Sequence, residues 1–220
     1  MYRVDGIFIT EAANSAGIAE LCASAKVPVV LVSREVPGAQ MTSVSCDDYT
    51  ASGVIAEHLY QTGHRRVACL LGAVEASTTQ KRLRGFMDKA AECGITVTSV
   101  MYGDYSYQSG KAQALALCAD APVLPEALFC SGDIIALGAM DALRSQLGLR
   151  VPEDISVIGF DDIAESDWLS YSLTTIAQPV EEMVNAACNA LIIMVENPGE
   201  KPPRMVFDCV LCQRNSVGKR

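Results

Sequence analysis

Residues 155–163, ISVIGFDDI, decide the fold class. An apolar run of strand length ends at a glycine and a phenylalanine, and two carboxylates, Asp161 and Asp162, follow directly. Parallel strands that helices cover on both faces are short, continuous apolar runs. In such sheets, ligands bind just beyond the carboxyl ends of the strands. The stretch therefore predicts a buried parallel strand whose tip presents acidic side chains.

The rest of the chain alternates between strand and helix patterns. The strand segments are rich in Val, Ile and Leu and are continuous rather than alternating, which favours a mostly parallel sheet. Several helical segments end at a glycine, the residue that most readily adopts a left-handed stop. The pattern predicts a doubly wound α/β fold. We expect strands at 4–9, 27–33, 41–46, 66–72, 95–103, 127–132, 155–160, 173–177 and 204–213, and helices at 14–25, 47–63, 78–94, 106–120, 133–148 and 179–197.

Composition narrows the function classes. The 220 residues carry a net charge of −9, and an acidic chain is a poor ligand for nucleic acids or anionic membranes, since phosphate contacts need clustered Lys and Arg. No apolar span is long enough for a transmembrane helix, and the opening MYRVDGIFIT has no signal-peptide pattern. The nine cysteines are scattered through apolar segments. This usage indicates reduced thiols and a cytoplasmic location.

Motifs for catalysis and cofactor binding are missing from the sequence. It contains no P-loop, no G-x-G-x-x-G after the first strand and no G-x-S-x-G elbow. Cys209 and Cys212 form a C-x-x-C within an extended pattern, where residues three apart face opposite sides, so we expect no metal or redox pair. His58 is expected on a helix surface and His64 in a solvated turn. We therefore predict a binding module with no catalytic residues, metal or cofactor, rather than an enzyme.

Acidic side chains follow three of the predicted strands. Asp104-Tyr105, Asp133 and Asp161-Asp162 each come directly after a strand. We expect Asp133 to cap the helix that it begins, and Asp162 to cap or form the local turn. Asp161 is still attached to the strand end. Because an ionised carboxylate accepts two or more hydrogen bonds, Asp161 suits sugar hydroxyls or a cationic group.

Motifs along nearly the whole chain resemble one family. That family is the LacI/GalR-type transcriptional regulators, whose effector-binding core has the fold of the periplasmic sugar-binding proteins. The segment RVPEDISVIGFDDI (150–163) is close to a family signature by itself, and HLYQTGHRRVACL (58–70) is another. The other matching motifs are VDGIFIT (4–10), VPVVLVSRE (27–35), KRLRGFMDKAAECG (81–94), CSGDIIALGAMDALRSQLG (130–148), SLTTIAQP (172–179) and CQRNS (212–216).

The resemblance implies two α/β lobes with a ligand cleft between them. The chain is expected to cross between the lobes near residues 46–48, 161–163 and 198–204. Residues 1–46 and 162–200 would then form the N-terminal lobe, and residues 47–161 and 201–220 the C-terminal lobe. Family members change their affinity for DNA when an effector opens or closes the cleft, which is a two-state shift.

Site residues carry over from the family where the motifs match. The resemblance implies that Arg82, in RLRGF, grips the ligand, that Tyr105 stacks on its ring, and that Asp161 accepts its hydroxyls. The effector would be a small sugar-like or nucleoside-like molecule. The alternative is that Arg82 and Asp161 form a structural ion pair.

Two predicted site positions depart from the family pattern. Many members carry Asp where this chain has Ser33, and Asn-Asp where it has Gly132-Asp133. Ser33 and Asp133 complete the set of predicted ligand-binding residues. Both departures remove polar side chains from the implied site, so the ligand is expected to be unusual, larger, or less tightly held.

The family's helix-turn-helix headpiece and hinge helix have no counterpart in the sequence. The first lobe is also expected to be truncated, by about 50 residues at 25–30 per βα unit, which would leave apolar faces and strand edges open. The chain is then either a fragment or mis-started reading frame of a full regulator, or a shortened protein that a partner covers. A homodimer is expected, with operator DNA bound only through the missing headpiece. The alternative function is a periplasmic-type solute-binding protein of a sugar transporter.

Overall fold

The computed structural model describes residues 4–10, 24, 27–33, 41–120, 123–200 and 202–220. The chain divides into two compact units. Unit 1 comprises Met1–Asp47, Glu75–Thr78 and Pro179–Asp208, and unit 2 comprises Asp48–Val74, Thr79–Gln178 and Cys209–Arg220. The first boundary between the units lies between Asp47 and Asp48. The other boundaries do not coincide with the predicted crossings near 161–163 and 198–204, because apart from Glu75–Thr78 the chain stays in unit 2 as far as Gln178 and returns to it at Cys209.

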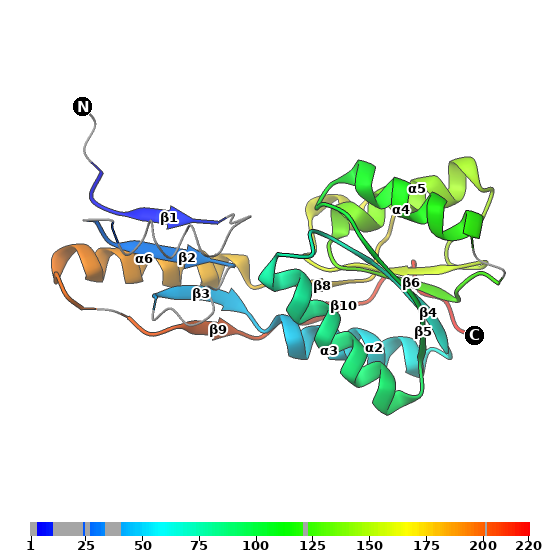
Figure 1. The fold of residues 1–220 in the computed structure, drawn as a ribbon, viewed down its shortest axis with the longest axis horizontal. Helices are drawn as coiled ribbons and strands as arrows, with labels where there is room; N and C mark the ends of the chain where they lie inside the picture. Colours follow the sequence, from blue (N-terminus) through cyan, green and yellow to red (C-terminus); the bar gives the residue numbers. More distant parts are fainter. Residues whose placement is uncertain (1–3, 11–23, 25–26, 34–40, 121–122, 201) are drawn as a thin grey trace. The chain divides into compact units, whose positions relative to one another are not determined.

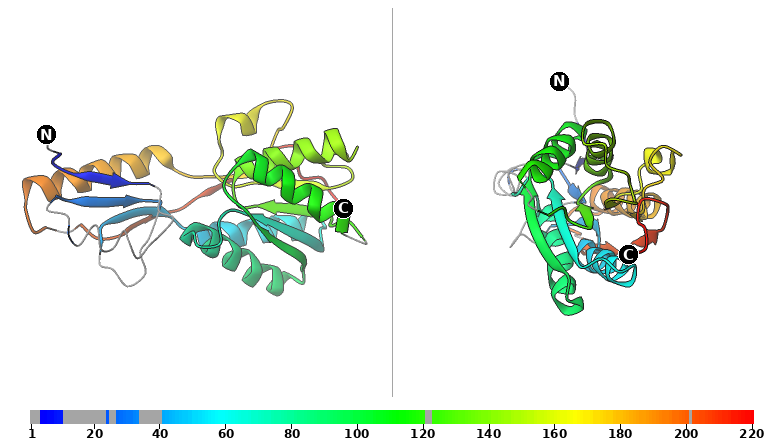
Figure 2. Two further views of the ribbon diagram at one scale, coloured as in Figure 1. Left: turned by 45° about the horizontal axis from the view of Figure 1, so that its top comes forward. Right: turned by 90° about the vertical axis from the view of Figure 1, so that its right-hand side faces the viewer.

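Unit 2 is a three-layered parallel α/β structure. Its sheet has the strand order β5-β4-β6-β7, and all three pairings are parallel, as the continuous apolar runs predicted. Helices α4 and α5 cover one face of this sheet, and α2 and α3 cover the other (Figures 1 and 2). The bounds are β4 Arg66–Leu71, β5 Thr96–Tyr102, β6 Ala127–Cys130, β7 Ser156–Ile158, α2 Asp48–Gln61, α3 Ser77–Cys93, α4 Tyr107–Asp120 and α5 Asp133–Gln146.

A two-stranded ribbon explains why the predicted boundaries move. Strand β8 (Thr175–Ala177) pairs antiparallel with β10 (Val210–Cys212). Single bridges join Ile158 to Thr174 and Asp161 to Ala177, so the segment after β7 stays in unit 2. The strand predicted at 204–213 is in fact two strands, and the first, β9 (Met205–Phe207), pairs with β3 in unit 1.

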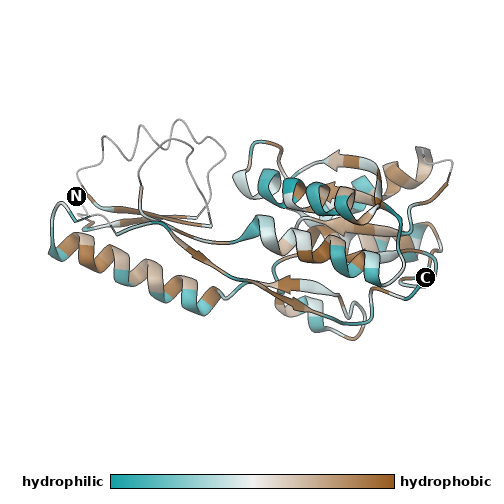
Figure 3. Ribbon diagram, turned by 90° about the horizontal axis from the view of Figure 1, so that it is seen from below, coloured by the Kyte–Doolittle hydropathy of each residue, from teal (hydrophilic) through white to brown (hydrophobic). Residues whose placement is uncertain are grey.

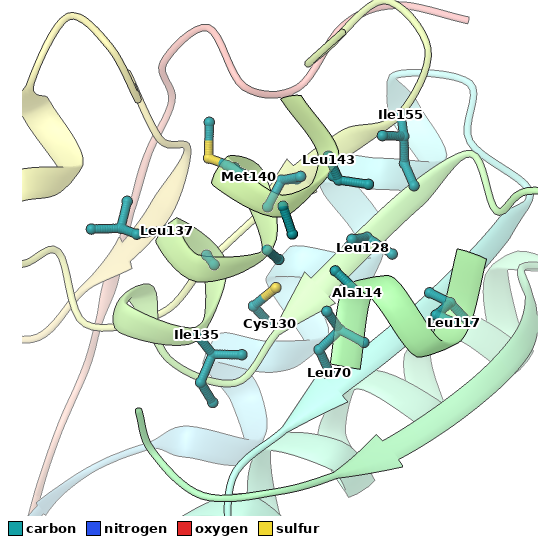
Figure 4. Close-up of a cluster of buried hydrophobic side chains, with 14 of the residues drawn as sticks. Leu70, Ala114, Leu117, Leu128, Cys130, Ile135, Leu137, Met140, Leu143 and Ile155 are labelled. Carbon is teal, nitrogen blue, oxygen red and sulfur yellow. The ribbon is translucent and has the colours of Figure 1, made fainter. Parts of the chain in front are cut away.

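The core of unit 2 lies between the sheet and helices α4 and α5. Close to fully buried side chains from β4, β6 and α5 interlock there, as Figure 4 shows for Leu70, Leu128 and Leu143. The two helices also approach each other closely through glycines. A Cβ built on Gly110 of α4 would lie 2.0 Å from the Ile135 carbonyl oxygen, and one on Gly138 of α5 would lie 2.0 Å from that of Tyr107.

Unit 1 contains a four-stranded parallel sheet in the order β1-β2-β3-β9. Its remaining strands are β1 (Ile7–Ile9), β2 (Val29–Val32) and β3 (Ser43–Cys46), and helix α6 (Val180–Glu196) packs against β2 and β3. Hydrophobic residues occur along the whole of α6 (Figure 3). Five of them are exposed: Val180, Val184, Ile192, Ile193 and Val195. The helix predicted at 14–25 lies outside the described residues, apart from helical Ser24.

None of the helices in the described ranges has the length and hydropathy needed to span a bilayer.

Candidate ligand-binding site

Arg82 is the most constrained side chain at the strand ends of unit 2. It extends from α3, is only 4% exposed, and places its guanidinium 3.6 Å from the centroid of the Phe160 ring. Its Nε donates to Asp48 Oδ1 at 2.7 Å, and its Nη1 donates to the Ser131 carbonyl oxygen at 2.7 Å. Burial opposes the charge of the guanidinium, but Asp161 and Asp48 outweigh it and raise the pKa of Arg82 well above its usual value. Arg82 is therefore permanently charged and held in one position.

Asp161 lies against Arg82 with one carboxylate oxygen. Its Oδ1 accepts a hydrogen bond from Arg82 Nη1 at 3.0 Å and another from Gln178 Nε2 at 2.6 Å. Its Oδ2 accepts no hydrogen bond from any described residue, and the side chain is 29% exposed. Burial raises the pKa of Asp161, although the charge of Arg82 and the amide of Gln178 oppose the shift. Asp161 thus offers one oxygen as a free acceptor.

The backbone at Asp161 is strained. Its φ of 121° lies in a region that favours glycine and costs any other residue about 1–3 kcal/mol. The surrounding structure enforces this conformation, since the amide of Asp161 donates to the Ile176 carbonyl oxygen at 2.8 Å. Strain of this kind concentrates at functional sites. Here it aims the carboxylate at the guanidinium.

Tyr105 completes the candidate site. The tyrosine is partly buried and packs on the core of unit 2. Its hydroxyl lies 2.9 Å from Thr79 Oγ1, in hydrogen-bonding contact. A Cβ on Gly132 would meet both the Tyr105 ring at 3.2 Å and Asp161 Oδ2 at 3.4 Å, so the ring and the free carboxylate oxygen both border the space at Gly132. An aromatic surface beside an acceptor suits a ligand with a ring that carries hydroxyl or amino groups.

Comparison with known proteins decides the family. Residues 56–217 match the model of the periplasmic binding protein-like domain. The chain belongs to this family. The resemblance to LacI-type regulators predicted from the sequence is also confirmed.

Three relatives illustrate that resemblance. The chain is 34% identical over 192 residues to the HTH-type transcriptional repressor CytR of Escherichia coli strain K12, an alignment that covers 86% of this chain and 56% of CytR. A LacI family transcriptional regulator from Mycobacterium smegmatis superposes with a TM-score of 0.90 at 28% identity, over 99% of this chain and 80% of that one. The CelR–cellobiose complex superposes with a TM-score of 0.89 at 30% identity, over 97% and 66%. The chain thus spans little more than half the length of CytR.

In this LacI-type chain, Asp133 does not cap its own helix as predicted. Helix α5 has no side-chain cap. The Asp133 carboxylate instead accepts hydrogen bonds from the Thr175 and Ser166 hydroxyls and from the amide of Ile163, at 2.6–3.1 Å. Burial raises its pKa to about 6, although these hydrogen bonds oppose the shift. Because Asp133 is 0% exposed and both of its oxygens are engaged, we assign it no ligand contact in the proposal below.

Asp162 was predicted to cap or form the local turn, and its φ of 56° is a left-handed conformation of the kind found in turns. Its side chain makes other contacts: Oδ1 lies 2.8 Å from Arg214 Nη2 in an ion pair, and Oδ2 accepts a weak hydrogen bond from the Cys212 thiol at 3.6 Å. The two adjacent carboxylates of the DDI motif therefore have separate roles. Asp161 faces Arg82, and Asp162 ties the β10 segment to the end of β7.

The structure does not test the prediction for Ser33, and it contradicts the prediction for His64. Ser33 follows β2 in unit 1 with a φ of 56°, and its ligand role stays a prediction. The prediction that His64 is solvated is wrong, since it is 0% exposed and its Nε2 lies 2.9 Å from Ser156 Oγ. The left-handed turn at Gly63, with a φ of 97°, leads into β4. Burial lowers the pKa of His64.

Two residues that hold the site together were not predicted from the sequence. Asp48 was recognised only as the start of a helix, and Gln178 was not considered. Their partners Arg82 and Asp161 lie 34 and 17 residues away in the sequence, so no local pattern signals either contact. One available signal was their position, since Asp48 begins helix α2 and Gln178 directly follows strand β8.

The candidate site combines a guanidinium, two carboxylates and an aromatic ring. In the described part of the chain, no group of three or more His, Cys, Asp or Glu side chains could hold a metal ion. Two carboxylates, Asp48 and Asp161, surround a single guanidinium. One carboxylate oxygen, Asp161 Oδ2, accepts no hydrogen bond from a described residue.

Proposed function

We propose that this chain is the effector-sensing part of a LacI-type transcriptional repressor. Its effector is a small, uncharged, ring-containing molecule such as a sugar or nucleoside, which binds at the strand ends of unit 2 and changes the affinity of the whole protein for operator DNA. The observation that carries the proposal is Asp161, strained at a strand tip, held by Arg82 through one oxygen and open at the other.

The charges of the candidate site favour an uncharged effector. A carboxylate only accepts hydrogen bonds, so the ligand must bring a donor, and hydroxyl groups of a sugar or nucleoside provide it. A phosphate or carboxylate placed against the free Oδ2 of Asp161 would be repelled by the charge of that carboxylate. A neutral ligand also occurs in a similar protein, since the CelR structure is a complex with cellobiose, an uncharged disaccharide.

Regulation requires a DNA-binding element in addition to the sensor. CytR is described as an HTH-type repressor, and the alignment covers 56% of it. We propose that operator contacts belong to a headpiece outside these 220 residues, and that the regulator acts as a cytoplasmic homodimer without catalytic activity. Ligand binding would shift the equilibrium between two conformations of the regulator. The size of the shift is set by the ratio of the ligand's affinities for the two conformations.

A thermal-shift screen tests the sensor proposal. We expect one or more sugars, nucleosides or purines to raise the melting temperature of the chain, and sugar phosphates to have no effect. The Asp161→Ala variant should lose the shift. Arg82→Ala should lose it too, whereas Arg84→Ala, on the same helix with a 79% exposed side chain, should keep it. A compound that stabilises the native chain and both site variants equally would rule out this site.

A mobility-shift assay tests the location of DNA binding. Residues 1–220 carry a net charge of −9 and should give no sequence-specific shift with operator DNA at about 150 mM salt. A tight, specific shift under that condition would contradict the proposal that a separate headpiece reads the operator.

A further inference from the structure

Two glycines lie against the ring of Tyr105 at the ends of adjacent strands. Gly72 follows β4, and Gly132 comes two residues after β6. These strands are parallel neighbours, so their carboxyl ends reach the same edge of the unit 2 sheet. Neither glycine has a left-handed backbone; Gly132, for example, has a φ of −164°. The absence of a side chain at these two positions therefore leaves room for a neighbouring group, and is not needed for the backbone conformation.

The Tyr105 ring occupies the space that two side chains would need. A Cβ on Gly72 would lie 2.3 Å from Tyr105 Cε2 and 2.5 Å from Cδ2. A Cβ on Gly132 would lie 3.2 Å from Cδ1 and 3.3 Å from Cε1. The two glycines thus contact opposite edges of the ring, which spans both strand ends. The edge over Gly132 is the one next to Asp161 Oδ2, which lies 3.4 Å from the same Cβ position.

The turn that carries Tyr105 is fixed to the end of β4. The amide of Gly103 donates to the Leu71 carbonyl oxygen at 3.0 Å, and Gln113 Nε2 donates to the same oxygen at 3.1 Å. The amide of Asp104 donates to Ser109 Oγ at 3.0 Å. With its turn fixed and its hydroxyl in contact with Thr79, the ring has few alternative positions. The glycines then decide how closely it approaches the strand ends.

We propose that Gly72 and Gly132 are positioning residues that set the ligand specificity of the site. Together they seat the Tyr105 ring across the ends of β4 and β6, with one edge beside the free oxygen of Asp161. The site then selects ligands in which a sugar or nucleoside ring packs on Tyr105 while a hydroxyl or amino group on that ring donates to Asp161 Oδ2. This inference rests on the proposed function, because it names the chemistry read at the same site.

The two glycines should respond differently to a single added methyl group. At Gly72, a Cβ at 2.3 Å from the ring forces Tyr105 out of its seat. At Gly132, the nearest atoms lie at 3.2–3.4 Å, so the ring and the carboxylate need to move by only a few tenths of an ångström. Gly53 on α2 provides a matched control, since its Cβ would meet nothing closer than 3.7 Å.

A double-mutant cycle tests, without any ligand, whether Gly72 positions the Tyr105 ring. We expect Gly72→Ala to lower the melting temperature by about 5 °C in the native background, and to have little or no effect in the Tyr105→Ala background, where the added methyl group fills vacated space. Gly53→Ala should behave the same in both backgrounds. An equal loss from Gly72→Ala with and without the Tyr105 ring would overturn the inference, because the glycine would then serve the backbone alone.

Calorimetric titration tests the effect on specificity. The probes are D-glucose, D-ribose, cellobiose, adenosine and cytidine. For those that bind the native chain, Gly72→Ala should weaken affinity about tenfold and change the order of preference among the probes, with no further loss in the Tyr105→Ala background. Unchanged affinity and preference in Gly72→Ala and Gly132→Ala would overturn this inference and leave the proposed function standing. Failure of every probe to bind the native chain would overturn both.

Discussion

A single guanidinium between two carboxylates organises the candidate site at the scale of individual residues. Replacing Arg82 by Met should destabilise the protein by about 3–5 kcal/mol, because Asp48 and Asp161 would both lose the buried guanidinium that they contact. Urea unfolding of native and variant chains measures this loss. Arg84→Met serves as the control and should change stability by less than about 0.5 kcal/mol, since its ion pair with Asp88 is exposed. Similar losses in both variants would show that Arg82 is not a buried organising charge.

Asp133 predicts a distinctive dependence of stability on pH. Burial raises its pKa from 3.8 in the unfolded chain to about 6, so the folded protein holds this proton more tightly than the unfolded chain does. The resulting stabilisation is fully present below about pH 4 and is lost as the pH rises through 6, a change of about 3 kcal/mol. The free energy of unfolding of Asp133→Asn should lack this decline. The difference between the two proteins, measured in urea from pH 4 to 7, removes the contributions of other carboxyls. A constant difference would contradict the assignment.

The sequence predicted residues that belong to motifs and missed those that act through distant contacts. Arg82 and Asp161 were predicted because RLRGF and VIGFDD are family motifs, and they lie 3.0 Å apart. Arg82 and Asp161 form an ion pair within unit 2, as the structural interpretation predicted. Asp161 Oδ2 is still free to accept a hydrogen bond, as the ligand-binding interpretation requires. Asp133 and His64 were misjudged because each lies beside a turn, where exposure is the usual outcome. Burial by segments far along the chain reversed that expectation.

At the scale of elements, helices α4 and α5 owe their close approach to glycine. Gly138→Ala should destabilise the protein by about 1–3 kcal/mol, because the new Cβ would lie 2.0 Å from the Tyr107 carbonyl oxygen of the facing helix. The steric cost of the new Cβ acts against the gain of about 1 kcal/mol in stability that alanine usually gives over glycine within a helix. Gly53→Ala on α2 has room for its Cβ and should be neutral or stabilising. Denaturant unfolding of the two variants distinguishes these outcomes, and a stabilised Gly138→Ala would refute the packing argument.

Most described helices and strands lie within a few residues of their predicted positions, because apolar periodicity and terminal glycines are local signals. The exception is the segment predicted as one strand at 204–213. Its two halves pair with β3 and with β8, in different units. Hydrophobic pattern alone carries no information about which sheet a strand joins, so the division at Asp208 and Cys209 could not be foreseen. For the same reason, no boundary between the units coincides with the crossing predicted near 161–163.

At the scale of the whole molecule, homodimerisation remains a proposal. Five apolar side chains of α6 are exposed in the isolated chain, and large exposed apolar surfaces commonly mark protein interfaces. Light scattering during size-exclusion chromatography should therefore report twice the 23.4 kDa mass of one chain. An Ile192→Asp variant, which places a charge on this surface, should shift the mass toward that of the monomer. A native chain that stays monomeric at high micromolar concentration would count against the dimer.

In the proposed function, regulation by the whole molecule depends on an effector that donates a hydrogen bond to Asp161. The most direct test is calorimetric titration of the strongest binder from the screen into native, Asp161→Asn and Asp162→Asn proteins. These neighbouring substitutions make the same chemical change, but only Asp161 has a free oxygen beside Tyr105. We predict that Asp161→Asn weakens binding about tenfold or more, the value of a hydrogen bond to a charged group, while Asp162→Asn binds nearly as the native chain does. Equal affinity in all three proteins, or a loss confined to Asp162→Asn, would contradict this role of Asp161.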